Sequence, residues 1–240
     1  MGTRKRNFIG VKDGVKENIE EIWNRIDEAA RKVGRKREEI ELVAVSKGVS
    51  AEKIREAVHS GIKIVGESRV QEAEVKHQEL RDIEGLEWHL VGHLQRNKAK
   101  RAHLLFDLIQ SVDKIELLRE LEHKAMDMKK LQRVLLQVNI SEEETKSGFS
   151  PDQVLNMAKE VSEFSYLQIE GLMGIASLAD DEDRIRTSFR RLRELFDEIK
   201  REDLPNFKMR YLSMGMSQDF ELAIEEGSNM IRIGRAIFGW

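Results

Sequence analysis

The chain has 240 residues, of which 40% are hydrophobic, so it can bury a substantial core, and this composition argues against a disordered chain. Its 41 basic and 44 acidic residues give a formal net charge of -3, a balance that argues against nucleic acid as a partner. Because the chain has no cysteine, disulfides, thiolate metal sites and cysteine nucleophiles are excluded, which fits a reducing cytoplasm.

The start of the sequence carries no targeting signal that we can identify. Residues 1–6 are basic, but residues 7–12 contain no apolar stretch long enough for a signal peptide. Arg6 also stands where an N-myristoylation signal needs Ser or Thr. No run along the chain approaches the ~20 apolar residues of a membrane span. We therefore expect a cytoplasmic protein that has no membrane partner.

Strand and helix patterns alternate along the rest of the chain. An amphipathic helix is predicted over residues 15–33, and short β-branched runs separated by helical patterns follow it. These runs cover residues 41–47, 62–67, 87–92, 105–112, 134–140, 168–176, 209–215 and 230–238. About eight strands with a helix after nearly every one fit an α/β fold, a (β/α)8 TIM barrel with an extra N-terminal helix. The competing doubly wound sheet lacks its phosphate fingerprint here, so we predict one barrel domain over residues 1–240.

Local signals predict several helix ends. Residues 150–153 supply a serine N-cap, a proline at the first helical position and a glutamine at the third. Asp113 and Glu116 predict a similar start for an earlier helix. Residues 60–61 and Gly227 are typical of helix ends.

The lysine that ends the first apolar run is the first candidate site residue. Residues 41–47 are typical of a strand buried on both faces, where an ammonium is costly unless it is paired or deprotonated. A lysine with a lowered pKa is the amine that forms Schiff bases with carbonyls. From this segment alone two interpretations stay open: Lys47 is such an amine, or it lies just past the strand and reaches water.

Two glycine-containing segments follow the last two predicted strands. Residues 213–217 precede a predicted helix, and their small residues let backbone N–H groups approach an anion. Residues 232–235 carry a glycine flanked by arginines. In this barrel the loops after strands seven and eight are the usual phosphate site, and closure places strand one beside strand eight. A phosphate site next to Lys47 indicates a phosphorylated aldehyde, either a sugar phosphate or pyridoxal 5'-phosphate (PLP).

Arg232 favours the second of these ligands. Residues two apart in a strand face the same way, so Arg232 can point into the barrel mouth together with Gly234. An arginine at the pyridine nitrogen of PLP would disfavour its protonation and weaken the ring as an electron sink. Such a site holds the cofactor but limits carbanion chemistry. The alternative interpretation is that Arg232 forms a structural ion pair inside the barrel.

Several longer motifs occur in one order along the chain. They are residues 45–47, 66–72, 88–98, 137–140, 146–148, 171–173, 212–220 and 232–234. In this order they resemble the YggS/PROSC family of pyridoxal phosphate homeostasis proteins, and the match runs from about residue 41 to residue 239. The resemblance implies a single-domain barrel like the N-terminal domain of alanine racemase. It also implies a role in regulating or buffering the cofactor, with no robust catalytic activity.

The resemblance also assigns the site. It implies that PLP is held as a Schiff base on Lys47, with Arg232 at the pyridine nitrogen and the phosphate near Ser213, Gly215 and Gly234. The cofactor-binding residues that we predict are Lys47, Ser68, Met173, Ser213, Met214, Gly215, Arg232, Gly234 and Arg235, with no catalytic residue and no metal ligand. The partners that we expect are PLP itself and PLP-dependent apo-enzymes, and we expect a monomer.

Three positions depart from the usual sequence of that family. Ser68 stands where asparagine is usual, Gly174 where threonine is usual, and Arg235 where threonine or serine is usual. Arg235 would replace a hydroxyl contact to the phosphate with a charged one, or turn outward.

The rival function is that of a PLP-dependent amino-acid racemase. Racemisation needs a base on each face of the cofactor, and in alanine racemase the second base is a tyrosine brought with an extra C-terminal domain. This sequence ends at Trp240, directly after its last predicted strand, and its two tyrosines, Tyr166 and Tyr211, lie before or inside strands. We therefore favour a PLP-binding homeostasis protein over an enzyme. A lysine-dependent aldolase ranks third, because no sugar-recognition pattern is identifiable.

Other polar clusters are interpreted as structural. His89 and His93 are four residues apart, which on a strand separates them by ~13 Å, too far for one metal ion. The arginines within residues 190–193 share a predicted helix with the acidic residues within 194–198, and together they indicate a solvated ion-pair face.

Overall fold

The structure is a computed structural model that describes residues 14–141, 147–176 and 181–239. Within these ranges parallel strands close into a barrel, in which each strand pairs with the next and the last pairs with the first. The strands are β1 (Glu41–Val45), β2 (Ile64–Glu67), β3 (Glu87–Leu90), β4 (Leu108–Val112), β5 (Gln132–Val138), β6 (Leu167–Gly174), β7 (Phe207–Ser213) and β8 (Met230–Ile233). The predicted α/β barrel is confirmed. The basic start of the sequence, Lys146 and Trp240 lie outside the described residues.

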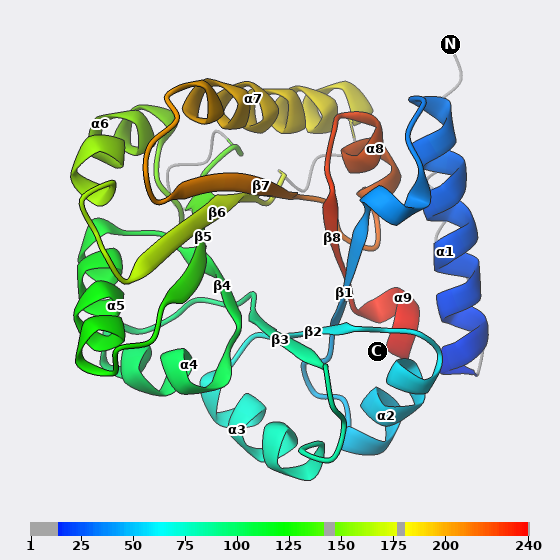
Figure 1. The fold of residues 1–240 in the computed structure, drawn as a ribbon. Helices are drawn as coiled ribbons and strands as arrows, with labels where there is room; N and C mark the ends of the chain where they lie inside the picture. The colour runs from blue at the N-terminus through cyan, green and yellow to red at the C-terminus, as the bar shows by residue number, and fades with distance from the viewer. Residues whose placement is uncertain (1–13, 142–146, 177–180, 240) are drawn as a thin grey trace.

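Helices cover the outer face of the barrel, as Figure 1 shows. They are α1 (Val15–Lys32), α2 (Ala51–His59), α3 (Val70–Glu79), α4 (Ala99–Leu105), α5 (Ile115–Asp127), α6 (Pro151–Val161), α7 (Glu182–Arg201), α8 (Phe220–Glu225) and α9 (Arg235–Phe238), with short 3-10 turns at Arg37–Glu39 and Arg96–Lys98. In the described ranges no helix combines the length and the apolar character that crossing a membrane requires.

The extra N-terminal helix covers the seam where the barrel closes. α8 and α9 have only 6 and 4 residues, too few to cover β8 and β1. α1 packs against α8, α9 and α2, on the right of Figure 1. Its apolar face buries Ile19, Ile22 and Ile26, and its buried Asn18 donates from Nδ2 to the Ile237 carbonyl at 3.1 Å. α1 therefore takes the place that a longer eighth helix would fill.

Alternate strand residues fill the barrel interior. Successive side chains of a strand point to opposite faces, so one set packs against the helices and the other packs inside. The inner set is Val43, Ile64, Leu108, Leu135, Met173, Tyr211 and Met230, with Val91 packed against it. β3 contributes no apolar side chain to this set, because its inward position, the register partner of Leu108, is His89. The interior is thus apolar except along the strands that carry the polar side chains described below.

Three of the helix-end predictions are confirmed. The Ser150 hydroxyl accepts a hydrogen bond from the Gln153 amide at 3.2 Å, and the Gln153 side chain accepts one from the Ser150 amide at 2.8 Å, so α6 begins with a full capping box. α2 and α8 are each followed by a glycine with positive φ, Gly61 at 95° and Gly227 at 102°.

Two local predictions are wrong. Asp113 does not cap α5, which begins at Ile115; its Oδ2 lies 3.2 Å from Nδ1 of His93 instead. The last predicted strand ends at Ile233 and not at residue 238, because the chain turns at Gly234 into α9. The apolar residues of α9 resemble a strand continuation in sequence, but they are buried against α1.

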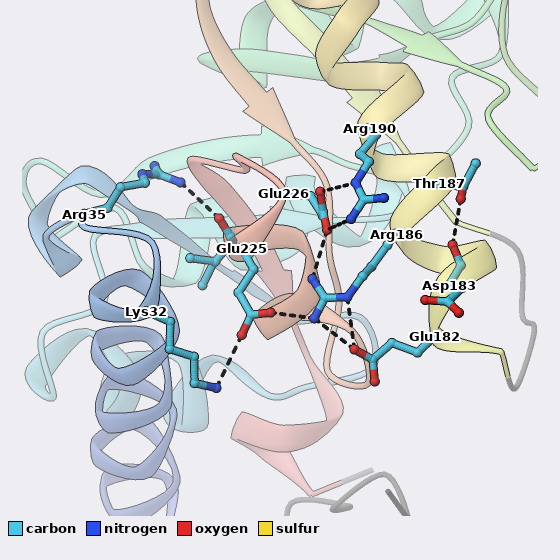
Figure 2. A network of polar contacts seen from close by, with 10 residues as sticks. Lys32, Arg35, Glu182, Asp183, Arg186, Thr187, Arg190, Glu225 and Glu226 are labelled. Atoms are coloured by element: carbon cyan, nitrogen blue, oxygen red, sulfur yellow. Dashed lines mark hydrogen bonds and ion pairs between the residues drawn. The ribbon is translucent and has the colours of Figure 1, made fainter. Parts of the chain in front are cut away.

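An ion-pair network joins α7, α8 and α1 (Figure 2). Arg186 of α7 donates to Glu225 at 2.6 Å and to Glu226 at 2.9 Å, both at the C-terminal end of α8. Glu226 also accepts from Arg190 at 2.8 Å, and Glu225 pairs with Lys32 of α1 at 3.3 Å. The predicted basic cluster therefore serves partly as a link between helices. The network holds the C-terminal end of α8, the short helix that follows the glycine-containing segment after β7.

We expect Gly171→Ala to destabilise the barrel far more than Gly85→Ala. Both glycines have positive φ, 146° and 73°. A Cβ at Gly171 would lie 1.8 Å from the Tyr211 carbonyl oxygen, whereas a Cβ at Gly85 would meet nothing within 4 Å. Backbone strain alone should cost about 1 kcal/mol at Gly85, and forcing β6 from β7 should add roughly 1–3 kcal/mol at Gly171. Urea unfolding of both variants measures this difference, and equal losses would contradict the packing argument.

Candidate functional site

The predicted site residues follow three neighbouring strands. β7 pairs with β8 and β8 pairs with β1, and because all strands are parallel their C-terminal ends share one rim of the barrel. This rim brings together Lys47, residues 213–215 and residues 232–235. Ser68 follows β2, the other neighbour of β1. Met173 is the register partner of Ser213 and lies inside the barrel.

Lys47 lies in the turn after β1, not within the strand. β1 ends at Val45, Ser46 is buried, and Lys47 is exposed. The expectation of one buried strand over residues 41–47 is therefore wrong at its end, because Gly48, with a φ of 70°, turns the chain away from the barrel wall. The amine of Lys47 is accessible from solvent at the rim.

Arg232 is a buried cation on the strand next to β1. Its relative exposure is 5%, and its guanidinium donates to the Ser213 hydroxyl at 2.6 Å and to the Gly174 carbonyl at 2.9 Å. Burial lowers the pKa of Arg232 to about 10, and the Asp219 carboxylate acts in the opposite direction. Arg232 forms no ion pair with any described residue, which disfavours a structural ion pair. A buried guanidinium without such a partner is costly, so this position suits a ligand with hydrogen-bond acceptors.

A chain of polar side chains runs from Arg232 across the barrel interior. The Ser213 hydroxyl donates to Gln110 Oε1 at 2.7 Å, and Gln110 Nε2 donates to Nδ1 of His89 at 2.9 Å. All four side chains are buried. Because a guanidinium can only donate, the Ser213 hydroxyl accepts from Arg232 and donates its own proton to Gln110 Oε1. This fixes the orientation of the Gln110 amide, whose nitrogen donates to His89. Nδ1 of His89 therefore accepts and carries no proton. Sequence reasoning missed Gln110, although a glutamine within an apolar strand was a visible signal.

The first two side chains of residues 213–217 already have partners. The Ser213 hydroxyl bonds to Arg232 and Gln110, and the Met214 side chain lies in the core between the strands and the helices. Gly215 has a φ of 96°, and a Cβ there would lie 2.6 Å from Cβ of Ala223. Only glycine fits this turn. Contacts from residues 213–215 to a phosphate would therefore come from their backbone.

Unused backbone donors occur in the two glycine-containing segments. Within the described part of the chain, the amides of Gly215, Ser217 and Gly234 donate to no carbonyl or side chain. Backbone N–H groups presented by small residues are suited to bind an anion. An exposed amine, a buried cation and such donors on adjacent strands fit the aldehyde, ring and phosphate of PLP.

The structure explains one of the three family departures. A Cβ at Gly174 would lie 2.7 Å from Cδ2 of Leu192 and 2.8 Å from Cδ1 of Ile140, so threonine would require the ends of these two side chains to move, whereas glycine fits without any change. The Gly174 carbonyl still contributes to the site through Arg232. Ser68 is half-buried and Arg235 is exposed, and neither side chain has a hydrogen bond or an ion pair to the other predicted site residues within the described ranges.

The two histidines have different surroundings. His89 is buried beside Gln110, with Nε2 3.6 Å from Oε1 of Glu87. His93 is exposed and pairs with Asp113 at 3.2 Å. No group of three or more His, Asp or Glu side chains among the described residues is arranged to hold a metal ion.

Comparisons with known proteins assign this chain to a family. A family model described as "Alanine racemase, N-terminal domain" matches residues 18–240. A protein of Aquifex aeolicus named pyridoxal phosphate homeostasis protein is 40% identical over 223 residues, which cover 93% of this chain and 96% of that protein. PipY of Synechococcus elongatus, in a structure solved with PLP bound, has a TM-score of 0.82 and 34% identity, and the match covers 94% of this chain and all of PipY.

Alanine racemase of Clostridium difficile shares the fold alone. Its TM-score is 0.73 at 16% identity, and the match covers 95% of this chain but 56% of the racemase. The match to the homeostasis proteins is closer in sequence and spans nearly the whole of both chains. The chain therefore belongs to the family of pyridoxal phosphate homeostasis proteins, which share the N-terminal barrel of alanine racemase.

Proposed function

We propose that this chain binds PLP covalently through Lys47 and serves in intracellular PLP homeostasis, without robust catalysis of its own. The observation that carries the proposal is the exposed Lys47 in the turn after β1, because β1 is the neighbour of the strand that carries Arg232, a buried cation with no ion pair to a carboxylate among the described residues. The names of two relatives support it: one is a pyridoxal phosphate homeostasis protein and the other was solved with PLP bound. When bound, PLP supplies an aldehyde that reacts reversibly with amines.

Each site residue has a role in holding this ligand. Lys47 would hold the cofactor through its amine, and the aldehyde of PLP would supply a carbon that condenses with that amine and gives up its oxygen as water. Arg232, which can only donate, would lie at the ring nitrogen and disfavour its protonation. The amides of Gly215 and Gly234 would bind the phosphate, and the Ser213 hydroxyl accepts a hydrogen bond that holds Arg232 in place.

Neither tyrosine, both of which lie in the described ranges, is placed to act as the second base that the racemase alternative needs. Tyr211 lies inside the barrel and is buried, and burial raises the pKa of its phenol, which disfavours a base role. Tyr166 comes directly before β6, at the opposite end of the strands from the candidate site. Arg232 at the ring nitrogen would also weaken the ring as an electron sink. A site of this kind favours holding PLP for PLP-dependent apo-enzymes over carbanion chemistry, in a cytoplasmic monomer.

Borohydride reduction of the PLP-loaded protein should leave a pyridoxyl group on Lys47. The exposed amine is the only lysine that follows a strand at this rim beside Arg232 in the described ranges, so it should react first. Peptide mapping after reduction locates the group, and Lys47→Ala should remove it together with the visible band. Lys53→Ala, an exposed lysine of α2, is the control that should keep both. Reduction on a different lysine would refute the assignment.

Arg232→Glu should change the absorption spectrum of the PLP-loaded protein. A carboxylate at the ring nitrogen would favour its protonated form, whereas Arg232 opposes it. Arg232→Gln, which carries no charge, should give an intermediate spectrum and is less disruptive to the interior. Circular dichroism checks that both variants fold. Identical spectra and affinities in all three proteins would return Arg232 to a structural role.

Racemisation of L-alanine by the PLP-loaded protein should be absent or trace. General-base catalysis contributes about 10²–10⁴-fold, so a site without a second base should turn over slowly at best. Chiral chromatography after long incubation measures the D-enantiomer. A rate of ~1–10³ s⁻¹ that disappears in Lys47→Ala would show that the chain is an enzyme.

A further inference from the structure

Three charged residues, two of them buried and the third half-buried, lie together outside the barrel wall, beside the turn that carries Lys47. Glu67 ends β2, and Glu72 and Lys76 lie one turn apart on α3, the helix beside β2 in Figure 1. A Cβ at Gly66 would face Val43 inside the barrel, so the side chain of the next residue, Glu67, points outward toward α3. The relative exposure is 0% for Glu67 and 6% for Lys76.

The Lys76 ammonium uses all three of its donors within this cluster. It donates to Glu67 Oε1 at 2.8 Å, to Glu72 Oε1 at 2.6 Å and to the backbone carbonyl of Ser46 at 2.6 Å. The Ser46 hydroxyl also donates to Glu67 Oε1. A lysine has three N–H donors, so its position is fully determined by these partners.

The cluster holds the chain on both sides of Lys47. On the N-terminal side, the carbonyl and the hydroxyl of Ser46 bond to Lys76 and Glu67. On the C-terminal side, the Gly48 amide donates to Glu72 Oε1 at 2.6 Å. The same carboxylate oxygen therefore accepts from the Gly48 amide and from Lys76, which links the two sides through one ammonium.

Electrostatics keeps this arrangement in place. Burial raises the pKa of Glu67, and the bonds from Lys76 and Ser46 oppose that rise. Partial burial also acts to raise the pKa of Glu72, but the bonds from Lys76 and the Gly48 amide outweigh it and hold that pKa below its ordinary value. Buried ion pairs rarely improve stability over apolar residues of the same volume. A cluster that contributes little net stability yet ties both neighbours of one exposed lysine is better explained by a positioning role.

We propose that Lys76, Glu67 and Glu72 are positioning residues that fix the backbone around Lys47 and so direct its amine toward the ring end of the site. This inference rests on the proposed function of Lys47 as the residue that binds the PLP aldehyde. None of the three has a hydrogen bond to the Lys47 amine; their bonds go to one another, to Ser46 and to the Gly48 amide. They restrict the turn between Ser46 and Val49, so that only the Lys47 side chain has rotational freedom.

A pair of substitutions at Glu72 separates the effect of its hydrogen bonds to the turn from the effect of its negative charge. Glu72→Gln keeps an oxygen that accepts from the Gly48 amide and from Lys76, whereas Glu72→Ala removes it. We expect Glu72→Ala to increase the hydrogen-exchange rate of the Gly48 amide by about tenfold or more, and to weaken PLP binding by about tenfold or more. In Glu72→Gln, both the exchange rate and the PLP affinity should stay within about threefold of the unchanged protein. Lys76→Met should resemble Glu72→Ala, and Glu72 carries the test if Lys76→Met fails to fold.

Arg133→Met is the matched control for a general loss of stability. Arg133 donates to Glu87 at 2.5 Å and pairs with Glu170 at 2.9 Å near the opposite ends of the strands. It should lower the melting temperature and leave PLP affinity unchanged. The inference is overturned if Glu72→Ala exchanges faster at Gly48 but binds PLP as the unchanged protein does, or if Arg133→Met weakens binding equally.

A readout without cofactor keeps the two proposals distinguishable. Brief acetylation of the unloaded protein with acetic anhydride, followed by peptide mapping, reports the reactivity of each lysine. We expect the Lys47 rate to change in Glu72→Ala and not in Arg133→Met, relative to Lys53 in the same sample. If the unchanged protein forms no adduct at Lys47, the proposed function fails while exchange and acetylation still test the positioning role. If the adduct forms but none of these rates depends on Glu72, only the positioning role fails.

Discussion

Closure of the barrel between β1 and β8 is the constraint on which the site depends. The pairing aligns Val43 with Arg232 and Ala44 with Ile233, two segments from opposite ends of the sequence. Without it, the amine of Lys47 and the guanidinium of Arg232 would have no common rim. Closure requires a cover for the seam, and α1 provides it through its buried apolar face and the bond from Asn18 to the last helix. The ion pairs from α7 to α8 hold the neighbouring wall (Figure 2).

The buried arginine imposes a second constraint, this one on the interior. A guanidinium carries hydrogen-bond donors and no acceptor, so the polar groups around it must accept, and the Ser213 hydroxyl and the Gly174 carbonyl do so. Ser213 then needs its own acceptor, and Gln110 supplies it from the far side of the barrel. The burial of Arg232 therefore accounts for the series of polar side chains from Ser213 to Gln110. Each member would be costly to bury alone, and each hydrogen bond along this series offsets part of that cost.

The sequence predicted the barrel, the order of its strands and the rim on which the site lies, because each rests on local periodicity and on a known rule of strand order. It placed the end of the first strand at Lys47 instead of Val45, because no local signal separates the last residue of a strand from the first residue of the turn after it. The interpretation that Lys47 lies just past the strand was one of the two left open, and it is the one that the structure confirms. Sequence reasoning also missed the contacts of Gln110 and Lys76, which join segments that only the fold brings together. The i, i+4 spacing of Glu72 and Lys76 was visible, but the carbonyl of Ser46, their common partner, was not.

The same geometry assigns the binding of the ligand and its release to different groups of the site. The groups that would hold the ring and the phosphate are buried or fixed by contacts within the protein, so binding would spend little energy on ordering them. The group that would hold the aldehyde is exposed, and the carbon–nitrogen bond proposed for it would break by addition of water. Release of the ligand then needs no opening of the barrel. An enzyme that stabilises a carbanion gains from excluding water at that point, whereas a protein that stores and returns an aldehyde gains from admitting it.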